Sequence, residues 1–361
     1  MTKQEYLDAL RAALSGMNQQ EQDAALSFCE EALMDRMESG MTEEEAVSAL
    51  ETPAQMAEKL AVHMSKATEK KQEAVKVTAK ETDAAPNEWK KMLLCCSADQ
   101  LNHIDLEAGN LPIKIILSQD DQVRLTYYTR PRNVYEAKVE GDTLILREIH
   151  SEKKTGLFNF FFNSEFGSLP RVEITLEVPE NMMADLSAKT RNAGLSIKGP
   201  QMLTYVNLGT TNGGLSVEQV KCITLDAHTS NGGLAANTTE TKKSLSLSTT
   251  NGSVSATNCS AKENFSLHTT NGGIAVNNCT AGQDMTIHTT NGGLAFAGLD
   301  AASLTLRTSN SRINGSVKGP QDQWKIDSHT TNGRNNLPSC QDGAKPLNVH
   351  TTNGNIHVTF E

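Results

Sequence analysis

The stretch Thr269-Thr270-Asn271-Gly272-Gly273-Ile274 recurs, intact or with substitutions, from residue 192 to the C-terminus. Its asparagine returns at intervals of 19 to 22 residues. A nearly constant period in this range indicates a repeat architecture, in which each unit packs on its neighbours, rather than a domain with one core. The copies of this asparagine are Asn192, Asn212, Asn231, Asn251, Asn271, Asn291, Asn310, Asn332 and Asn353.

Each repeat contains two short segments in which apolar residues alternate with polar ones. Leu245 and Leu247 precede one turn, and Val254 and Ala256 follow it. A period of two predicts β-strands. We expect the Asn-Gly pair to form a tight corner between the two strands, because both residues tolerate a positive φ.

Asn-Gly between alternating strands is also typical of antiparallel hairpins, so a meander is the alternative fold. The regular phase favours a solenoid, because coils that return every 20 residues stack identical side chains at the strand spacing of about 4.8 Å. The predicted fold is therefore mainly β, a β-solenoid of about 20-residue coils over 181–361.

Residues 1–64 have a different pattern, with capping residues ahead of short amphipathic helices. Thr2 with Glu5 and Thr42 with Glu45 are two capping boxes. The sequence predicts a small helical bundle, with Tyr6, Leu10, Leu14, Phe28, Ala32 and Leu33 on its apolar stripes. Because a bundle of this size cannot comfortably cover all of this apolar surface, we expect residues 1–64 to bind a protein partner or to self-associate.

Charge is concentrated at the N-terminus. Residues 1–85 contain 9 Lys and Arg against 17 Asp and Glu, of a total net charge of -10. An acidic module without a basic stripe does not favour direct nucleic-acid binding. Residues 65–87 are expected to be a linker. No apolar run is long enough for a transmembrane segment and the first residues are polar, so we expect a cytoplasmic protein.

The β domain is expected to begin at residue 88, with irregular strands over 88–180 that cap the solenoid and cover its open edge. The predicted strands are 111–117, 123–128, 135–139, 144–149 and 172–178. A phenylalanine cluster within this region is either a plug for the end of the solenoid or a patch for a partner; its members are Phe158, Phe160, Phe161 and Phe162.

A histidine stands three residues before the asparagine in five repeats, on the phase that should face solvent; these residues are His228, His268, His288, His329 and His350. Neighbouring imidazoles in such a column could share a metal ion or a proton. The simpler interpretation is an ordinary polar outer face, because no Cys or carboxylate has a matching phase.

Enzymatic chemistry is not indicated. Carboxylates that would act together must converge on one face, and the acidic residues of the repeats fall at different phases; they are Glu218, Asp226, Glu240, Glu263 and Asp284. We find no phosphate-binding or nucleophile motif. The sequence predicts neither catalytic residues nor a cofactor, and a carbohydrate-active β-helix enzyme is only a remote alternative.

Two resemblances follow from these motifs. Met1-Thr2-Lys3-Gln4-Glu5-Tyr6-Leu7, Gly40-Met41-Thr42-Glu43-Glu44-Glu45-Ala46 and Leu50-Glu51-Thr52-Pro53 resemble the HAAS signalling domain of bacterial proteins, and this resemblance implies a PadR-type regulator as partner. The Thr-Asn-Gly-Gly repeats resemble a bacterial β-strand-repeat family of the DUF4097 type, known as putative adhesins, which implies a right-handed β-helix. Together they imply a signalling or regulatory adaptor, with an adhesin-like surface protein as the alternative.

Overall fold

The structure, a computed structural model, describes residues 2–15, 22, 26, 33, 37, 42–48, 52–57, 89–130, 134–149, 172–340 and 342–361. The chain divides into two compact units, Met1–Val75 and Lys76–Glu361. This division falls inside the predicted linker, 65–87, and that segment lies outside the described residues. So do the phenylalanine cluster and most of the predicted second helix.

The N-terminal unit contains α1 (Lys3–Ala13) and α3 (Glu43–Ser48). The Thr2 hydroxyl accepts from the Glu5 backbone N–H at 3.2 Å, and the Glu5 carboxylate accepts from the Thr2 backbone N–H at 2.9 Å, so the predicted capping box is present. Thr42 and Glu45 form the same arrangement ahead of α3.

The apolar stripe of α1 is the core of this unit. Tyr6, Leu10 and Leu14 are 1%, 0% and 2% exposed and pack with Leu33 and Val47. The described residues of the predicted stripes are therefore covered within the unit, whereas Phe28 and Ala32 lie outside the described residues.

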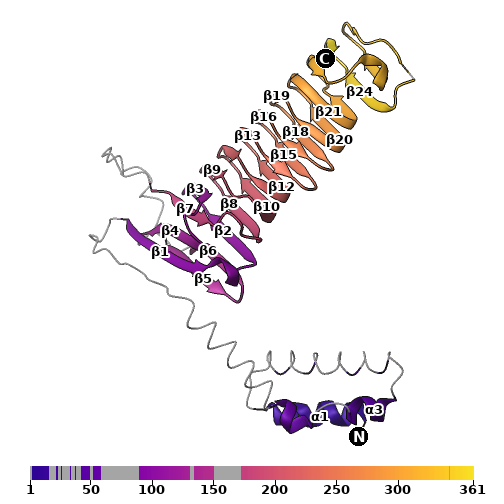
Figure 1. Cartoon of the computed structure of the whole chain (residues 1–361). Coiled ribbons are helices and arrows are strands. Elements are labelled where there is room, and N and C mark those ends of the chain that lie inside the picture. Colours follow the sequence, from indigo (N-terminus) through magenta and orange to yellow (C-terminus); the bar gives the residue numbers. More distant parts are fainter. Residues whose placement is uncertain are drawn as a thin grey trace. The chain divides into compact units, whose positions relative to one another are not determined.

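The second unit is a solenoid with two long sheets (Figure 1). Sheet A contains β1 (Lys90–Ser97), β3 (Ile113–Leu117), β4 (Gln122–Thr129), β7 (Ile174–Val178), β9 (Leu195–Lys198), β11 (Leu215–Glu218), β13 (Leu234–Asn237), β16 (Val254–Thr257), β19 (Ile274–Asn277), the start of β21 (Leu294–Arg307), β22 (Ile313–Val317) and β25 (Ile356–Phe360). Sheet B contains β2 (His103–Ala108), β5 (Val134–Glu140), β6 (Thr143–Ile149), β8 (Asp185–Thr190), β10 (Leu203–Thr210), β12 (Lys221–Thr229), β14 (Glu240–Thr241), β15 (Leu245–Thr249), β17 (Ser260–Ala261), β18 (Phe265–Thr269), β20 (Thr280–Thr289), the rest of β21, β23 (Trp324–Thr330) and β24 (Lys345–Thr351). Two 3₁₀ turns, Ala98–Gln100 and Gln321–Gln323, precede strands.

The strands of the regular coils pair in parallel with the same position of the next coil. Leu267 stands opposite Leu247 on one side and Ile287 on the other. Leu267 and Phe265 are fully buried between the sheets, whereas His268 is exposed. The solenoid prediction is confirmed, since hairpins would pair antiparallel.

In the regular coils, a buried threonine fixes the Asn-Gly corner that follows the strand of sheet B. The Thr269 hydroxyl accepts from the Gly272 backbone N–H at 3.2 Å and donates to the Gly252 carbonyl of the preceding coil at 2.9 Å. The equivalent threonines of the neighbouring coils repeat both bonds. Each corner is thus joined to the corner beneath it, and its backbone polar groups are satisfied away from water.

The glycine after asparagine serves close packing rather than a positive φ. A Cβ built on Gly272 would lie 1.9 Å from the Gly252 carbonyl oxygen, so no other residue fits at this stacking distance. The left-handed residues occur instead at the next corner, at Gln219, Thr238, Asn258 and Asn278. The positive φ expected at the Asn-Gly corner is therefore found at the other corner of the coil.

Antiparallel strands close the N-terminal end of the solenoid. In sheet A, β1 and β7 pair antiparallel with β4, and in sheet B β5 pairs antiparallel with β6. The five strands expected between residues 111 and 178 are present as β3 to β7, within a few residues of the predicted limits. The sequence analysis missed β1 and β2.

The C-terminal coils do not follow chain order. Strand β24 lies between β21 and β23, with Arg307 opposite His350 and His350 opposite His329. In sheet A, β22 pairs with β25. In sheet B, the final segment of the chain therefore lies between β21 and β23, although it follows both in sequence.

Candidate binding surface

The five predicted histidines lie on one face of sheet B, in a line of residues that face outward from successive strands. We call this line the histidine column; from the N-terminal end it consists of Glu107, Lys189, Gly209, His228, Ser248, His268, His288, Arg307, His350 and His329. The repeat spacing alone revealed the histidines. It did not reveal that Glu107 and Lys189 belong to the column. It also did not reveal that His350 lies between Arg307 and His329.

Adjacent imidazoles of the column stack on one another. The rings of His268 and His288 are nearly parallel, with centroids 5.2 Å apart. The pKa of His288 is lowered. The main cause is partial burial, which disfavours the charged imidazolium, and the nearby His268 and Arg307 add smaller repulsive contributions. His288 therefore resists protonation.

The column does not assemble a metal centre from its own ligands. Within the ranges that the structure describes, no three His, Cys, Asp or Glu side chains are close enough to hold a metal ion together. The carboxylate near the column's C-terminal end, Asp327, lies 3.5 Å from His350 Nε2. This contact is suited to an ion pair when the imidazole is protonated.

The asparagines of the repeat form a hydrogen-bonded ladder at the surface. Asn271 Nδ2 donates to Asn251 Oδ1 at 2.6 Å, and Asn291 Nδ2 donates to Asn271 Oδ1 at 2.7 Å. The same bond joins every neighbouring pair of predicted turn residues, namely Asn192, Asn212, Asn231, Asn251, Asn271, Asn291, Asn310, Asn353 and Asn332. Every amide in the middle of the ladder both donates and accepts, so the ladder stabilises the stack.

One ladder residue was missed. Asn110 Oδ1 accepts from Asn192 Nδ2 at 2.7 Å, across 82 residues of sequence. Asn110 is followed three residues later by Ile113, just as Asn192 is followed by Leu195. That spacing could have identified residues 103–117 as a coil of the solenoid.

The carboxylates of the repeats stand opposite lysines or uncharged residues. Glu218 pairs in register with Lys198, and Glu240 pairs on one side with Lys221; these ion pairs measure 2.7 Å and 3.4 Å. Asp226 pairs in register with Ser246, Glu240 with Ser260, and Asp284 with Ser303. These three acidic side chains do not stack on one another, which is the arrangement that their phases predicted.

The described cysteines are half-buried or buried thiols. Burial is the main cause that raises the pKa of Cys96 to about 11 and that of Cys222 to about 12. Both thiols are thus protonated at neutral pH, and a protonated thiol is a weak nucleophile.

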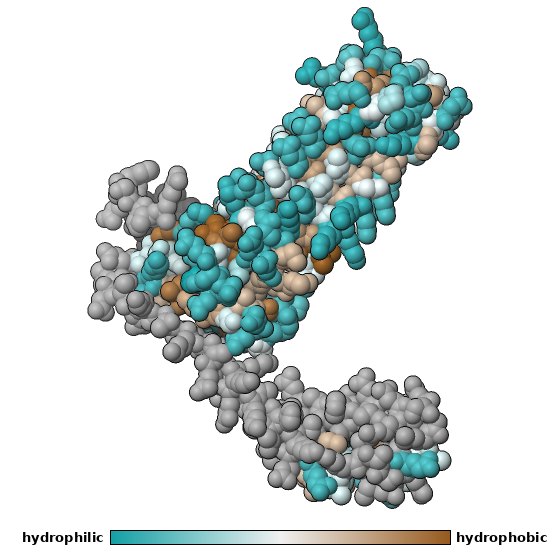
Figure 2. Space-filling view, viewed as in Figure 1, coloured by the Kyte–Doolittle hydropathy of each residue, from teal (hydrophilic) through white to brown (hydrophobic). Residues whose placement is uncertain are grey.

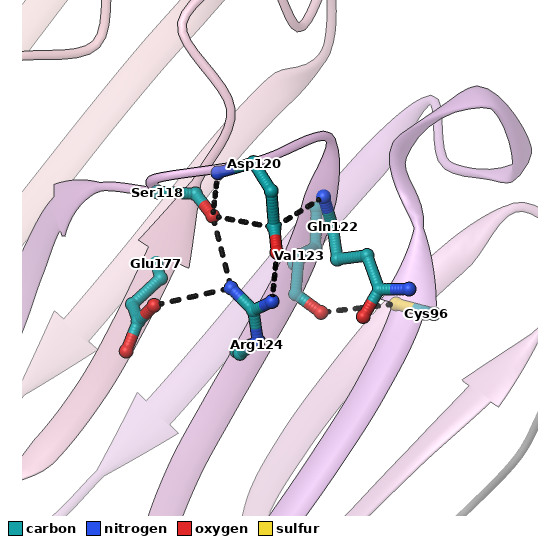
Figure 3. Close-up of polar contacts among 7 residues, drawn as sticks. All are labelled: Cys96, Ser118, Asp120, Gln122, Val123, Arg124 and Glu177. Atoms are coloured by element: carbon teal, nitrogen blue, oxygen red, sulfur yellow. Dashed lines mark hydrogen bonds and ion pairs between the residues drawn. The ribbon is translucent and has the colours of Figure 1, made fainter.

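A polar cluster around Arg124 secures the N-terminal end of sheet A (Figure 3). Its guanidinium binds the Asp120 carboxylate, donates to Ser118 Oγ at 3.2 Å and reaches Glu177 Oε2 at 3.5 Å. The Asp120 carboxylate also accepts from the Gln122 backbone N–H. The bond with Arg124 is the main cause that lowers the pKa of Asp120. This cluster, one guanidinium with two carboxylates, holds the turn between β3 and β4.

Hydrophilic side chains cover most of the face of the solenoid seen in Figure 2. Within the part of the chain that the structure describes, no helix is long and apolar enough to cross a membrane.

Comparison with known proteins gives two family matches. The model of the family described as Toastrack DUF4097 matches residues 101–359, and the HAAS model matches residues 5–59. The search of curated proteins gave no match.

Three solved structures are similar to the chain. One, a "putative adhesin" from Parabacteroides distasonis, is 13% identical with a TM-score of 0.40, over 76% of this chain and 98% of that one. Another, a "putative adhesin" from Parabacteroides merdae, is 10% identical with a TM-score of 0.30, over 77% and 100%. A "putative cell adhesion protein" from Clostridium sporogenes is 12% identical with a TM-score of 0.23, over 76% and 100%.

Proposed function

Because the chain belongs to the Toastrack DUF4097 family and carries a HAAS domain at its N-terminus, we propose that it is a non-enzymatic adaptor. In this proposal the HAAS unit binds a protein partner, a PadR-type regulator or a second copy of the chain. The solenoid acts as a scaffold that presents its outer faces. The protein acts in the cytoplasm and does not contact nucleic acid itself.

The observation that carries the proposal is the union of these two domains in one chain. The surface of the solenoid supports it, because the column and ladder residues form extended rows along successive coils. Extended repeat surfaces of this kind are typical of proteins that bind other molecules.

The partner test uses the full-length protein and a chain lacking residues 1–64. Size-exclusion chromatography with light scattering is run on each, with and without the PadR-type regulator. We expect the full-length chain to form a dimer or to bind the regulator, and the truncated chain to do neither. Binding that survives the truncation would move the partner site to the solenoid.

Cell fractionation tests the location. We expect the protein in the cytoplasmic fraction. Recovery at the cell surface would contradict the adaptor proposal and favour the adhesin-like alternative.

A further inference from the structure

A hollow of about 430 Å³ lies on the outer face of sheet B, where the N-terminal cap meets the first regular coils. Its lining comes from β2, β6, β8, β10 and β12 and from the corner residues that follow β8, β10 and β12. The side chains that give it its chemistry are Glu107, Glu148, Lys189, Arg191 and His228. We call it the Gly209 hollow, after the glycine in its floor.

The hollow exists because Gly209 interrupts the histidine column. Lys189 and His228 are its neighbours in register on either side. A Cβ on Gly209 would lie 2.8 Å from Cε1 and Nε2 of His228 and 3.5 Å from Cγ of Lys189. Both side chains therefore lie beside the space above the glycine, and both line the hollow.

Of the three cations that line this hollow, Arg147 is paired with acidic side chains, whereas Lys189 and Arg191 stand apart from those pairs. Glu107 stands in register with Lys189, yet its carboxylate lies 3.7 Å from Nε of Arg147, which also binds Asp105. Among the residues that the structure describes, no carboxylate is within ion-pair distance of Lys189 or Arg191. Around Arg124, by contrast, two carboxylates are within ion-pair distance.

The remaining lining is polar and partly acidic. Glu148 places its carboxylate above Gly109, in the space that a Cβ would occupy. Thr211 and Ser230 also line the hollow. A carboxylate and hydroxyls accept hydrogen bonds from ligand hydroxyls, whereas the Lys189 and Arg191 side chains are donors that prefer an anion.

We propose that the Gly209 hollow binds an acidic sugar, a small hydroxylated ligand with one carboxylate or phosphate group. The anionic group contacts Lys189, Arg191 and His228, and the hydroxyls face Glu107 and Glu148. The Gly209 gap gives the ligand room that no other position of the column leaves. This inference is independent of the partner of the HAAS unit.

The test is isothermal titration calorimetry on the full-length chain with three probes at about 0.15 M salt: D-glucuronate, D-glucose 6-phosphate and D-glucose. We expect at least one anionic probe to bind, and at least ten times more tightly than glucose. The two anionic probes distinguish a carboxylate ligand from a phosphate ligand. No binding by either, or glucose binding as tightly, would overturn the proposal.

Variants locate the site. Gly209→Ile fills the gap and Lys189→Gln removes a cation, and each is expected to weaken binding at least tenfold. Thr286→Ile, on the same face of sheet B, and Lys325→Gln, at its far end, are the controls and should change affinity less than twofold. Thermal unfolding verifies that each variant is folded. Equal affinity in wild type, Gly209→Ile and Lys189→Gln would place binding elsewhere.

Discussion

Side chains on neighbouring strands contact one another differently in the regular coils and in the N-terminal cap. In the coils, Asn251, Asn271 and Asn291 bond to copies of themselves at 2.6 to 2.7 Å. In the cap, unlike residues meet, and Arg124 stands opposite Glu177 in register. A stack of one residue type works for an amide, which donates and accepts, whereas like charges at the strand spacing repel.

This difference predicts that the coils depend on their register and the cap on complementary charge. Deletion of one whole period, residues 252–271, joins equivalent corners and should leave a folded, shorter protein. Deletion of residues 252–261 brings residues of different phase together and should abolish cooperative unfolding of the later coils. Circular dichroism during thermal unfolding measures both, and a more damaging whole-period deletion would refute the 20-residue register.

A charge inside a coil should be the most damaging single substitution. Leu267 is fully buried between the sheets, so Leu267→Asp is expected to lower the free energy of unfolding by more than about 4 kcal/mol. His268→Asp, one residue away on the outer face, should cost less than about 1 kcal/mol. Denaturant unfolding compares the two, and equal losses would contradict the assigned inner and outer faces.

The hydrogen bonds of the buried corner threonine should contribute measurably to the free energy of unfolding. Thr269→Val keeps the shape but leaves the Gly272 N–H and the Gly252 carbonyl without their partner. We expect a loss of about 1–3 kcal/mol in unfolding free energy. The matched control is Thr286→Val on the exposed face, for which the loss should stay below about 0.5 kcal/mol; a similar loss in both would show that the corner bonds add little.

The ion pairs of the cap should contribute less, and their contribution should depend on salt and pH. Arg124→Met is expected to lower the melting temperature by about 1–3 °C at low salt and by less at high salt. Because Arg124 lowers the pKa of Asp120 below its ordinary value of 3.8, this stabilisation is complete above pH 4 and is lost as the pH falls below it. An effect of Arg124→Met that is unchanged at high salt and at pH 3 would exclude a charge-based origin.

The histidine column should give the coils a pH dependence at higher pH than the cap. The pKa of His288 is lowered from its ordinary value of 6.5, so its neutral form stabilises the fold fully above pH 6.5, and this contribution is lost as the pH falls below it. The effect should be small, because the ring is only partly buried. His288→Gln should make the melting temperature vary less between pH 7.5 and 5.5; identical slopes in wild type and variant would remove His288 as the cause.

The repeat itself was readable because its signals are local. Alternation around each Asn-Gly pair gave the strands and separated inward Leu267 from outward His268, since both follow from the two-residue period of a strand. The 20-residue spacing gave the solenoid, because each coil meets only its neighbours. The capping boxes at Thr2 and Thr42 were equally local.

Only the tertiary structure revealed the contacts between segments that are distant in sequence or that do not share the repeat pattern. Asn110 joins the ladder across 82 residues, and β24 enters between β21 and β23, because pairing depends on which edges are free rather than on chain order. The Gly209 hollow arises where coils from both regions meet. Gly272 looks like a turn residue in sequence, and only the stacked coils show that the carbonyl of Gly252 leaves no space for a side chain there.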